Sequence, residues 1–421
     1  MNILKSYLDN KKKYISLFHT LIRGFSLLLQ LLFIKLSINK VSPDQFNIVI
    51  IIQTFISLSG IFDFGQPVIA QTFALKSKNS YFAFKKSLKI LFFSIGLIFI
   101  SLFSVFFILG FNSQGILNQT QIFNLFLLLG VSSAFLLLAN LATRIAFSSR
   151  FGYLLSSVLA LPPIINFLYL KYFLRDFSGY NLSILVLTTF LLSSILTLII
   201  FFIKYYKEKN KSISKKFLYV SQKKVLKEGL KVWGASAIGS IILQSDNFIL
   251  WIVSPSSLVQ YYLAMKFANV FLFLVSLDLP RIFSQITLSN ELSKIKKLIF
   301  LQHIKIVIVS FLTFVSIKLL TNVIWGDSNV GIGLSFLVSL YVFVRSSSDF
   351  FSYSLQAIEE YKLPLLYLPF QLAITYCLAI VFVPNIGSLG MVISHLIGFL
   401  FTASWILPYY FLKKYQKRLT A

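Results

Sequence analysis

Long runs of apolar residues without a charged side chain recur throughout this sequence. The stretch from Phe46 to Gly60, FNIVIIIQTFISLSG, contains no Asp, Glu, Lys or Arg, and the next charge is the carboxylate of Asp63. Apolar runs of about 18 residues or more are typical of helices that cross a membrane. Only 12% of the 421 residues are charged, whereas soluble domains contain about 25%. The pattern therefore predicts an all-α, multi-pass membrane protein and excludes a soluble globular domain.

Hydropathy predicts about twelve transmembrane helices. Their lengths lie near 20 residues, which suits a hydrocarbon core about 30 Å thick. The fifth helix contains Pro162 and Pro163, and paired prolines must kink or break a helix. The predicted ranges are 15–36, 46–64, 87–111, 121–143, 151–173, 182–203, 232–253, 258–279, 299–320, 331–351, 363–384 and 387–411.

The positions of the basic residues predict how the chain is oriented in the membrane. If the N-terminus lies in the cytoplasm, 32 of the 39 Lys and Arg residues fall on the cytoplasmic side and 5 on the opposite side. The positive-inside rule then places both termini in the cytoplasm. The net charge of +26 could suggest a nucleic-acid partner. Because the cations occur in short clusters between apolar runs and not on one exposed face, we expect no nucleic acid.

Cysteine and histidine usage gives no indication of a metal site. Cys377 is the single cysteine in the sequence, which excludes a disulfide within the chain and a cysteine-based metal site. The three histidines, His19, His303 and His395, are not spaced as metal ligands, and we expect neither a metal nor a cofactor. The basic N-terminal segment continues into the first helix without a small-residue cleavage site, so we interpret it as a retained helix and not a signal peptide.

A basic segment at 208–231 divides the predicted helices into two groups of six. We expect an N-lobe of helices 1–6 at 1–207 and a C-lobe of helices 7–12 at 232–421. A shift of 215 residues aligns Asp63 with Asp278, each at the cytoplasmic end of its helix. Two six-helix lobes related by such pseudo-two-fold symmetry are typical of transporters.

The two aligned aspartates and the nearby Arg281 lie at the predicted cytoplasmic boundary. A carboxylate at a helix C-terminus is opposed by the helix dipole, so each aspartate needs a cationic partner or caps the segment that follows. Gly65 and Pro67 would permit a sharp turn and the start of a new helix. We interpret Asp63, Asp278 and Arg281 as architectural or gating residues and not as substrate contacts.

Three charged side chains, Arg23, Asp246 and Lys266, are predicted inside the membrane. A cation that faces lipid near the bilayer centre costs at least about 2.5–3.5 kcal/mol. Arg23 and Lys266 should therefore face a wet cavity or a carboxylate. Asp246 could pair with Lys266, or bind a proton or another cation, and the sequence leaves these roles open.

Four polar residues are further candidates for a cavity. Gln30, Gln53 and Gln244 could line a sugar path, although such residues more often form hydrogen bonds between helices. His19 lies one helical turn before Arg23 and could share its face.

Four stretches of the sequence carry a resemblance to a known family. They are HTLIRGFSLLLQLLFIKL and SPDQFNIVIIIQTFISLSGIFDFGQPVIAQTFA in the first half, and WGASAIGSIILQSDNFILWIVSPSSLVQYYLAMKFANV and LPRIFSQI in the second half. With the length and the helix number, they resemble Wzx-type flippases of O-antigen and capsular polysaccharide. These flippases are part of the multidrug/oligosaccharidyl-lipid/polysaccharide exporter (MOP) superfamily. The resemblance covers nearly the whole chain.

The resemblance implies a fold, a substrate and a location. It implies two lobes arranged as a V around a central cavity. The substrate would be an undecaprenyl-diphosphate-linked oligosaccharide, moved from the cytoplasmic to the periplasmic leaflet of the bacterial inner membrane by alternating access. Arg23 and Lys266 match the cavity cations and would contact the diphosphate. The implied partners are the lipid-linked glycan and membrane lipids, and contact with the polysaccharide polymerase machinery is left open.

Two other functions remain open at this point. An ion-coupled small-molecule or multidrug exporter of the same superfamily would be expected to present acidic cavity residues, whereas cations predominate here. A membrane polysaccharide polymerase or glycosyltransferase would need carboxylates to hold a metal or activate a hydroxyl. The sequence contains no Asp-x-Asp motif, and without a Gly-Lys dipeptide it contains no P-loop for ATP. We therefore predict a transporter and not an enzyme.

Overall fold

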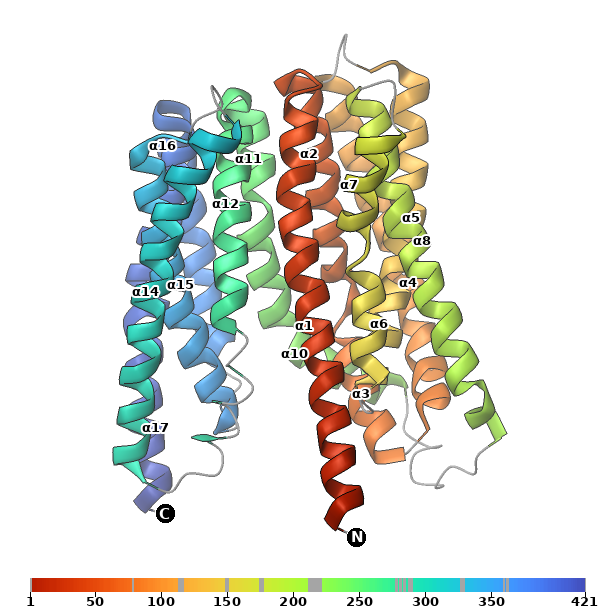
Figure 1. Cartoon of the computed structure of the whole chain (residues 1–421), viewed down its shortest axis with the longest axis vertical. Coiled ribbons are helices and arrows are strands. Elements are labelled where there is room, and N and C mark those ends of the chain that lie inside the picture. Colours follow the sequence, from red (N-terminus) through yellow and green to blue (C-terminus); the bar gives the residue numbers. More distant parts are fainter. Residues whose placement is uncertain are drawn as a thin grey trace. The chain divides into compact units, whose positions relative to one another are not determined.

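The computed structural model consists of helices grouped in two units, Met1–Gln244 and Ser245–Ala421, which we describe separately (Figure 1). The residues that the structure describes are 2–77, 79–112, 117–147, 151–173, 178–210, 222–276, 279, 282, 285–286, 291–325, 330–358, 360 and 363–420.

Among the described residues, the first unit contains nine α-helices and two 3₁₀ helices. In chain order these elements are α1 (Asn2–Ile38), α2 (Pro43–Leu58), the 3₁₀ helix η1 (Ser59–Asp63), α3 (Gln66–Ser77), α4 (Ser80–Asn112), α5 (Gln119–Ala146), α6 (Phe151–Leu159), α7 (Pro162–Tyr172), α8 (Gly179–Tyr205), the 3₁₀ helix η2 (Tyr206–Asn210) and α10 (Gln222–Gln244).

The second unit begins directly after α10. Its elements are α11 (Asp246–Val253), α12 (Pro255–Ser276), α14 (Leu292–Trp325), α15 (Ile332–Ala357), α16 (Leu363–Phe401) and α17 (Ala403–Thr420). The division between the units therefore lies between Gln244 and Ser245. Helix α10 packs against α2, η1 and α3 of the first unit, and a lobe boundary in the linker at 208–231 stays a prediction.

The twelve predicted ranges all fall on helices, which confirms the all-α fold. Among the residues that are described, nine helical stretches are long and apolar enough to cross a membrane. The last of them, Leu363–Lys417, has 55 residues, far more than the roughly 20 that one crossing needs. It folds back at Gly387, whose φ of 53° is left-handed and favours glycine. The last stretch therefore covers two predicted helices, and the other eight cover one each. Helix α4 and the pair α10–α11 correspond to the remaining two of the twelve.

The break predicted at the paired prolines is present. Helix α6 ends at Leu159, and α7 begins at Pro162 with Pro163 as its second residue. Proline has no backbone N–H to donate and fits the first turn of a helix, where that donor has no partner in any case. The sequence thus ends one helix and starts the next within a single predicted span.

Local sequence signals also set where other helices begin. The Ser42 hydroxyl accepts from the backbone N–H of Gln45 and Pro43 opens α2, as is typical of an N-cap followed by proline. Asn118 and Gln121 form a reciprocal capping box at the start of α5. These caps satisfy backbone donors that a helix cannot satisfy internally.

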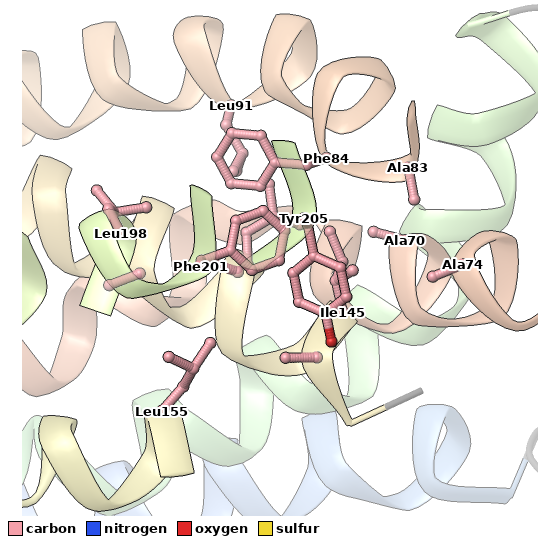
Figure 2. Packing of buried hydrophobic residues seen from close by; sticks show 14 residues of the cluster. Ala70, Ala74, Ala83, Phe84, Leu91, Ile145, Leu155, Leu198, Phe201 and Tyr205 are labelled. Carbon is pink, nitrogen blue, oxygen red and sulfur yellow. The ribbon is translucent and has the colours of Figure 1, made fainter. Parts of the chain in front are cut away.

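A cluster of aromatic and small residues forms a core of the first unit (Figure 2). Phe84 of α4, and Phe201 and Tyr205 of α8, are buried there, with ring centroids 5.2 Å apart for Phe84–Phe201 and 4.9 Å for Phe201–Tyr205. Small residues such as Ala142 and Ala146 of α5 let neighbouring helices approach closely. The core thus joins α4, α5 and α8 by packing.

Large apolar side chains also lie on the surface. Phe311, Phe370 and Ile380 are 64%, 69% and 71% exposed. Such a surface is unfavourable in water and suited to lipid. With the apolar spans, it marks a multi-pass membrane protein.

Candidate substrate and coupling sites

Arg23 lies on α1 with its side chain exposed on the first unit. Its Nη2 donates to the hydroxyl of Ser156 on α6, with 2.8 Å between the heavy atoms. Among the described residues it forms no ion pair with a carboxylate. A guanidinium carries five N–H donors, so this single bond leaves others available for an anion.

His19 lies beside Arg23, as the spacing of four residues predicts. Its Nδ1 is 3.1 Å from the hydroxyl of Ser157 on α6, and its ring packs against Tyr153, with centroids 5.5 Å apart. The Ser157 hydroxyl donates its own proton to the carbonyl of Tyr153 at 2.9 Å. The Ser157 oxygen therefore accepts a hydrogen bond from Nδ1–H of His19. The Nε2 atom of His19 remains available to other partners.

Lys266 lies at the middle of α12 in the second unit. Its Nζ is 4.8 Å from the centroid of the Tyr262 ring, a cation–π contact within one turn of the same helix. In the part of the chain that is described, Lys266 forms no ion pair, so the alternative in which it pairs with Asp246 is not observed.

Asp246 opens α11 and is 2% exposed. Its Oδ2 accepts hydrogen bonds from the hydroxyl of Tyr261 on α12 and from Nε2 of His395 on α16, the latter at 2.7 Å. Three helices of the second unit thus meet at one carboxylate oxygen. The carboxylate is satisfied by a phenol and an imidazole and not by a lysine.

Asp63 ends η1 and organises the turn into α3. Its Oδ1 accepts from the backbone N–H of Gly65 at 2.7 Å, and Arg144 of α5 interacts with it electrostatically. Phe64 and Gly65 have positive φ values of 48° and 67°, and α3 begins at the next residue. The turn and new helix start that the sequence predicts after Asp63 are therefore present.

Helix α10 packs directly on this turn. Trp233 donates through Nε1 to the carbonyl of Ile61, and its ring lies 5.4 Å from that of Phe64. A Cβ placed on Gly65 would come within 2.3 Å of the carbonyl oxygen of Gly229 on α10. The turn after Asp63 is thus a packing joint between α10 and the first unit, which fits an architectural role.

The remaining candidates are not assembled into one site. Asp278 and Arg281 lie outside the described residues. Gln30 on α1, Gln53 on α2 and Gln244 at the end of α10 are half-buried in the first unit. A role for these glutamines in a sugar path stays a prediction.

Several contacts were not visible in the sequence. Ser156 and Ser157 meet α1 from more than 130 positions away, and His395 meets Asp246 across 149 positions. Arg345 and Asp349 form a pair at 3.7 Å within α15, and their spacing of four residues was a signal that could have been used. Within the described residues, no group of three or more His, Cys, Asp or Glu side chains could hold a metal ion.

Comparison with known proteins connects this geometry to a class of transporter. No family model matches the chain. A predicted O-antigen export protein of Yersinia pseudotuberculosis is 26% identical over 312 residues, which is 70% of each chain. A predicted O-antigen transporter of Salmonella typhi is 25% identical over 194 residues, which is 44% of this chain and 45% of that protein.

Solved structures share the fold over almost the full length. An inward-facing MATE-family multidrug resistance transporter of the MOP superfamily superposes with a TM-score of 0.70 at 14% identity, covering 95% of this chain and 99% of that one. The lipid II flippase MurJ, in an inward closed conformation, gives a TM-score of 0.65 at 16% identity, covering 95% and 89%. The chain thus has the fold of MOP-superfamily transporters, and its sequence is similar to O-antigen export proteins. The relatives and the structural neighbours are named as export proteins, transporters or flippases, and the predicted fold class is confirmed.

Proposed function

We propose that this protein is a flippase for lipid-linked oligosaccharides and a member of the MOP superfamily. Its substrate would be an undecaprenyl-diphosphate-linked repeat unit of O-antigen or capsule. The direction would be from the cytoplasmic to the periplasmic leaflet of the bacterial inner membrane. The similarity to the two O-antigen export proteins supports this substrate class.

The observation that carries the proposal is the exposed guanidinium of Arg23 within an apolar span. Arg23 belongs to the candidate span Phe18–Ile38 and is anchored by Ser156, while no described carboxylate neutralises it. An uncompensated cation at this place needs an anion or water. A diphosphate offers bidentate oxygen pairs that match a guanidinium, and a diphosphate fixed to a lipid would bring that anion into the membrane.

The positive charge of the candidate residues Arg23 and Lys266 favours this function over a multidrug exporter. A cavity for cationic drugs would present carboxylates. Asp246 is 2% exposed and already bonded to Tyr261 and His395, and Asp349 of α15 pairs with Arg345 at 3.7 Å. Arg23 and Lys266 lack such partners among the described residues. An exporter of cationic drugs would therefore have to use other residues.

Deleting the gene should block surface polysaccharide and trap its precursor. We expect single repeat units on undecaprenyl diphosphate to accumulate on the cytoplasmic face, because sugars cannot cross the apolar core unaided. Mass spectrometry of extracted lipids, with lectin labelling of intact cells, measures both effects. Repeat units that reach the outer leaflet unpolymerised would indicate a polymerase defect and contradict the proposal.

We also propose that both termini lie in the cytoplasm. Single cysteines introduced at Ser256 and Asn385, which are exposed in the second unit, should react with an impermeant thiol reagent on intact cells in a Cys377→Ser background. A cysteine at Asn210, beside the basic linker, should react only after the membrane is opened. Labelling of Asn210→Cys in intact cells would contradict this orientation.

A further inference from the structure

Two adjacent serines of α6 bind the polar side chains of α1 that lie against them. Ser156 and Ser157 are 3% and 4% exposed. Ser156 accepts a hydrogen bond from Arg23 at 2.8 Å, and the Ser157 oxygen lies 3.1 Å from Nδ1 of His19. Because both contacts come from neighbouring residues of one helix, the guanidinium and the imidazole are fixed relative to each other. Their backbone positions are about 6 Å apart along α1.

The hydrogen bonds of Ser157 decide which nitrogen of His19 carries the proton. A serine hydroxyl has one proton, and Ser157 donates it to the carbonyl of Tyr153 at 2.9 Å. The Ser157 oxygen can then only accept from His19, so Nδ1 carries the proton. A second positive charge one turn from Arg23 would be repelled, which favours the neutral imidazole. Nε2 of His19 therefore carries a lone pair and is a hydrogen-bond acceptor.

The other contacts of His19 leave this acceptor unused. Its ring packs against Tyr153 with centroids 5.5 Å apart, and Tyr153 in turn packs edge-on against Phe147 at 5.3 Å. His19 is half-buried, and in the described part of the chain no group donates a hydrogen bond to its Nε2. A polar acceptor thus lies beside an available cation inside the apolar span Phe18–Ile38.

A ligand that satisfies both Arg23 and His19 needs an anion and, close to it, a hydrogen-bond donor. An ionised diphosphate by itself offers only acceptors. In a glycosyl diphosphate, the donor nearest to the phosphate is the substituent on C2 of the first sugar, either a hydroxyl or an acetamido N–H. A lipid-linked sugar therefore satisfies Arg23 through its phosphate and His19 through this C2 substituent.

We propose that His19 determines specificity for the first sugar of the lipid-linked oligosaccharide by accepting a hydrogen bond from its C2 substituent. Ser157 is a positioning residue, because it fixes the proton of His19 on Nδ1. A sugar without a donor at C2 leaves the acceptor unpaired and is transported less well. This inference rests on the proposed function and adds a sugar contact to its phosphate site.

Flipping of two synthetic lipids by the purified full-length protein in liposomes tests the proposal. The probes are undecaprenyl diphosphate glucose and its 2-deoxyglucose analogue, which differ in the C2 hydroxyl alone. Both keep the vicinal hydroxyls at C3 and C4, so impermeant periodate measures the exposed fraction of each lipid. The wild-type protein should flip the glucose lipid about fivefold faster, from the lower end of the cost of an unpaired acceptor at a partly exposed site.

Three variants separate recognition by His19 from a structural role. His19→Phe keeps an aromatic ring without the acceptor, and it should flip the two lipids at rates within about twofold of each other. Ser157→Ala allows the proton of His19 to move from Nδ1 to Nε2, so the preference should fall in the same way. His303→Phe is the matched control on α14, where Nδ1 of His303 lies 2.8 Å from the carbonyl of Ile299. It should keep the wild-type preference.

The ratio of the two flipping rates decides the outcome. A wild-type protein without a preference, or an unchanged preference in His19→Phe, would overturn the proposal. If His19→Phe does not fold, Ser157→Ala gives the same test, since it removes a single hydroxyl and an unchanged ratio there would also overturn the proposal. Failure of the wild-type protein to flip either lipid would instead contradict the proposed function.

Discussion

Replacing Arg23 with alanine should reduce polysaccharide export at least about 30-fold while the protein still accumulates in the membrane. Removing one side of a desolvated charge pair costs about 2 kcal/mol or more, and each 1.4 kcal/mol is a factor of ten. Arg23→Lys should retain part of the export because a cation remains, although the bidentate geometry is lost. Export is measured as surface polysaccharide in a deletion strain that carries each variant.

Lys266→Ala should reduce export to a similar extent if both cations contact the same diphosphate. Lys35→Ala is the matched control, since Lys35 is also a cation on α1 but lies in its last turn. Full export by both Arg23→Ala and Lys266→Ala would show that the two cations are not phosphate contacts. An equal loss of export in Lys35→Ala would show that export depends on the positive charge of α1 in general and not on Arg23 in particular.

Adding a single methyl group at Gly65 should strongly destabilise the first unit. The Cβ of Gly65→Ala would lie 2.3 Å from the carbonyl oxygen of Gly229, far inside van der Waals contact, and the residue has a φ of 67°. A non-glycine residue at positive φ alone costs of the order of 1–3 kcal/mol. Because the clash is with backbone, α10 must shift as well, and the yield of folded protein should fall sharply.

Gly60→Ala is the matched control for this effect. Gly60 lies in η1 five residues earlier, and a Cβ there meets nothing within 4 Å. Thermal unfolding of the two variants in the same detergent compares them directly. We expect Gly60→Ala to unfold close to the wild-type temperature and Gly65→Ala well below it. Equal unfolding temperatures would mean that α10 does not pack tightly on the turn after Asp63.

The overall fold could be predicted from the sequence because a membrane leaves few alternatives. Backbone groups in lipid must be satisfied within the chain, so each long uncharged run has to form a helix. Local signals were equally readable, such as the break at Pro162 and the turn after Asp63. Both depend on residue types that restrict or free the backbone at a single position.

The candidate charged residues could also be found in the sequence, because a charged residue within an apolar run is easy to recognise. Arg23, Lys266 and Asp246 were singled out in this way. The spacing of four residues also placed His19 beside Arg23 on one helix face. The sequence by itself thus determined the class of protein, the helices, their local breaks and which charged residues call for an explanation.

Only the tertiary structure decided which side chains these residues meet. Asp246 could have paired with Lys266, but the packing of α11, α12 and α16 brings Tyr261 and His395 to its carboxylate instead. The same holds for Ser156 beside Arg23 and for the contacts of α10 with α2, η1 and α3. Apart from the bond between Asp246 and Tyr261, these contacts join residues more than a hundred positions apart. They follow from how helix surfaces fit together, and no local pattern of residue types records that fit.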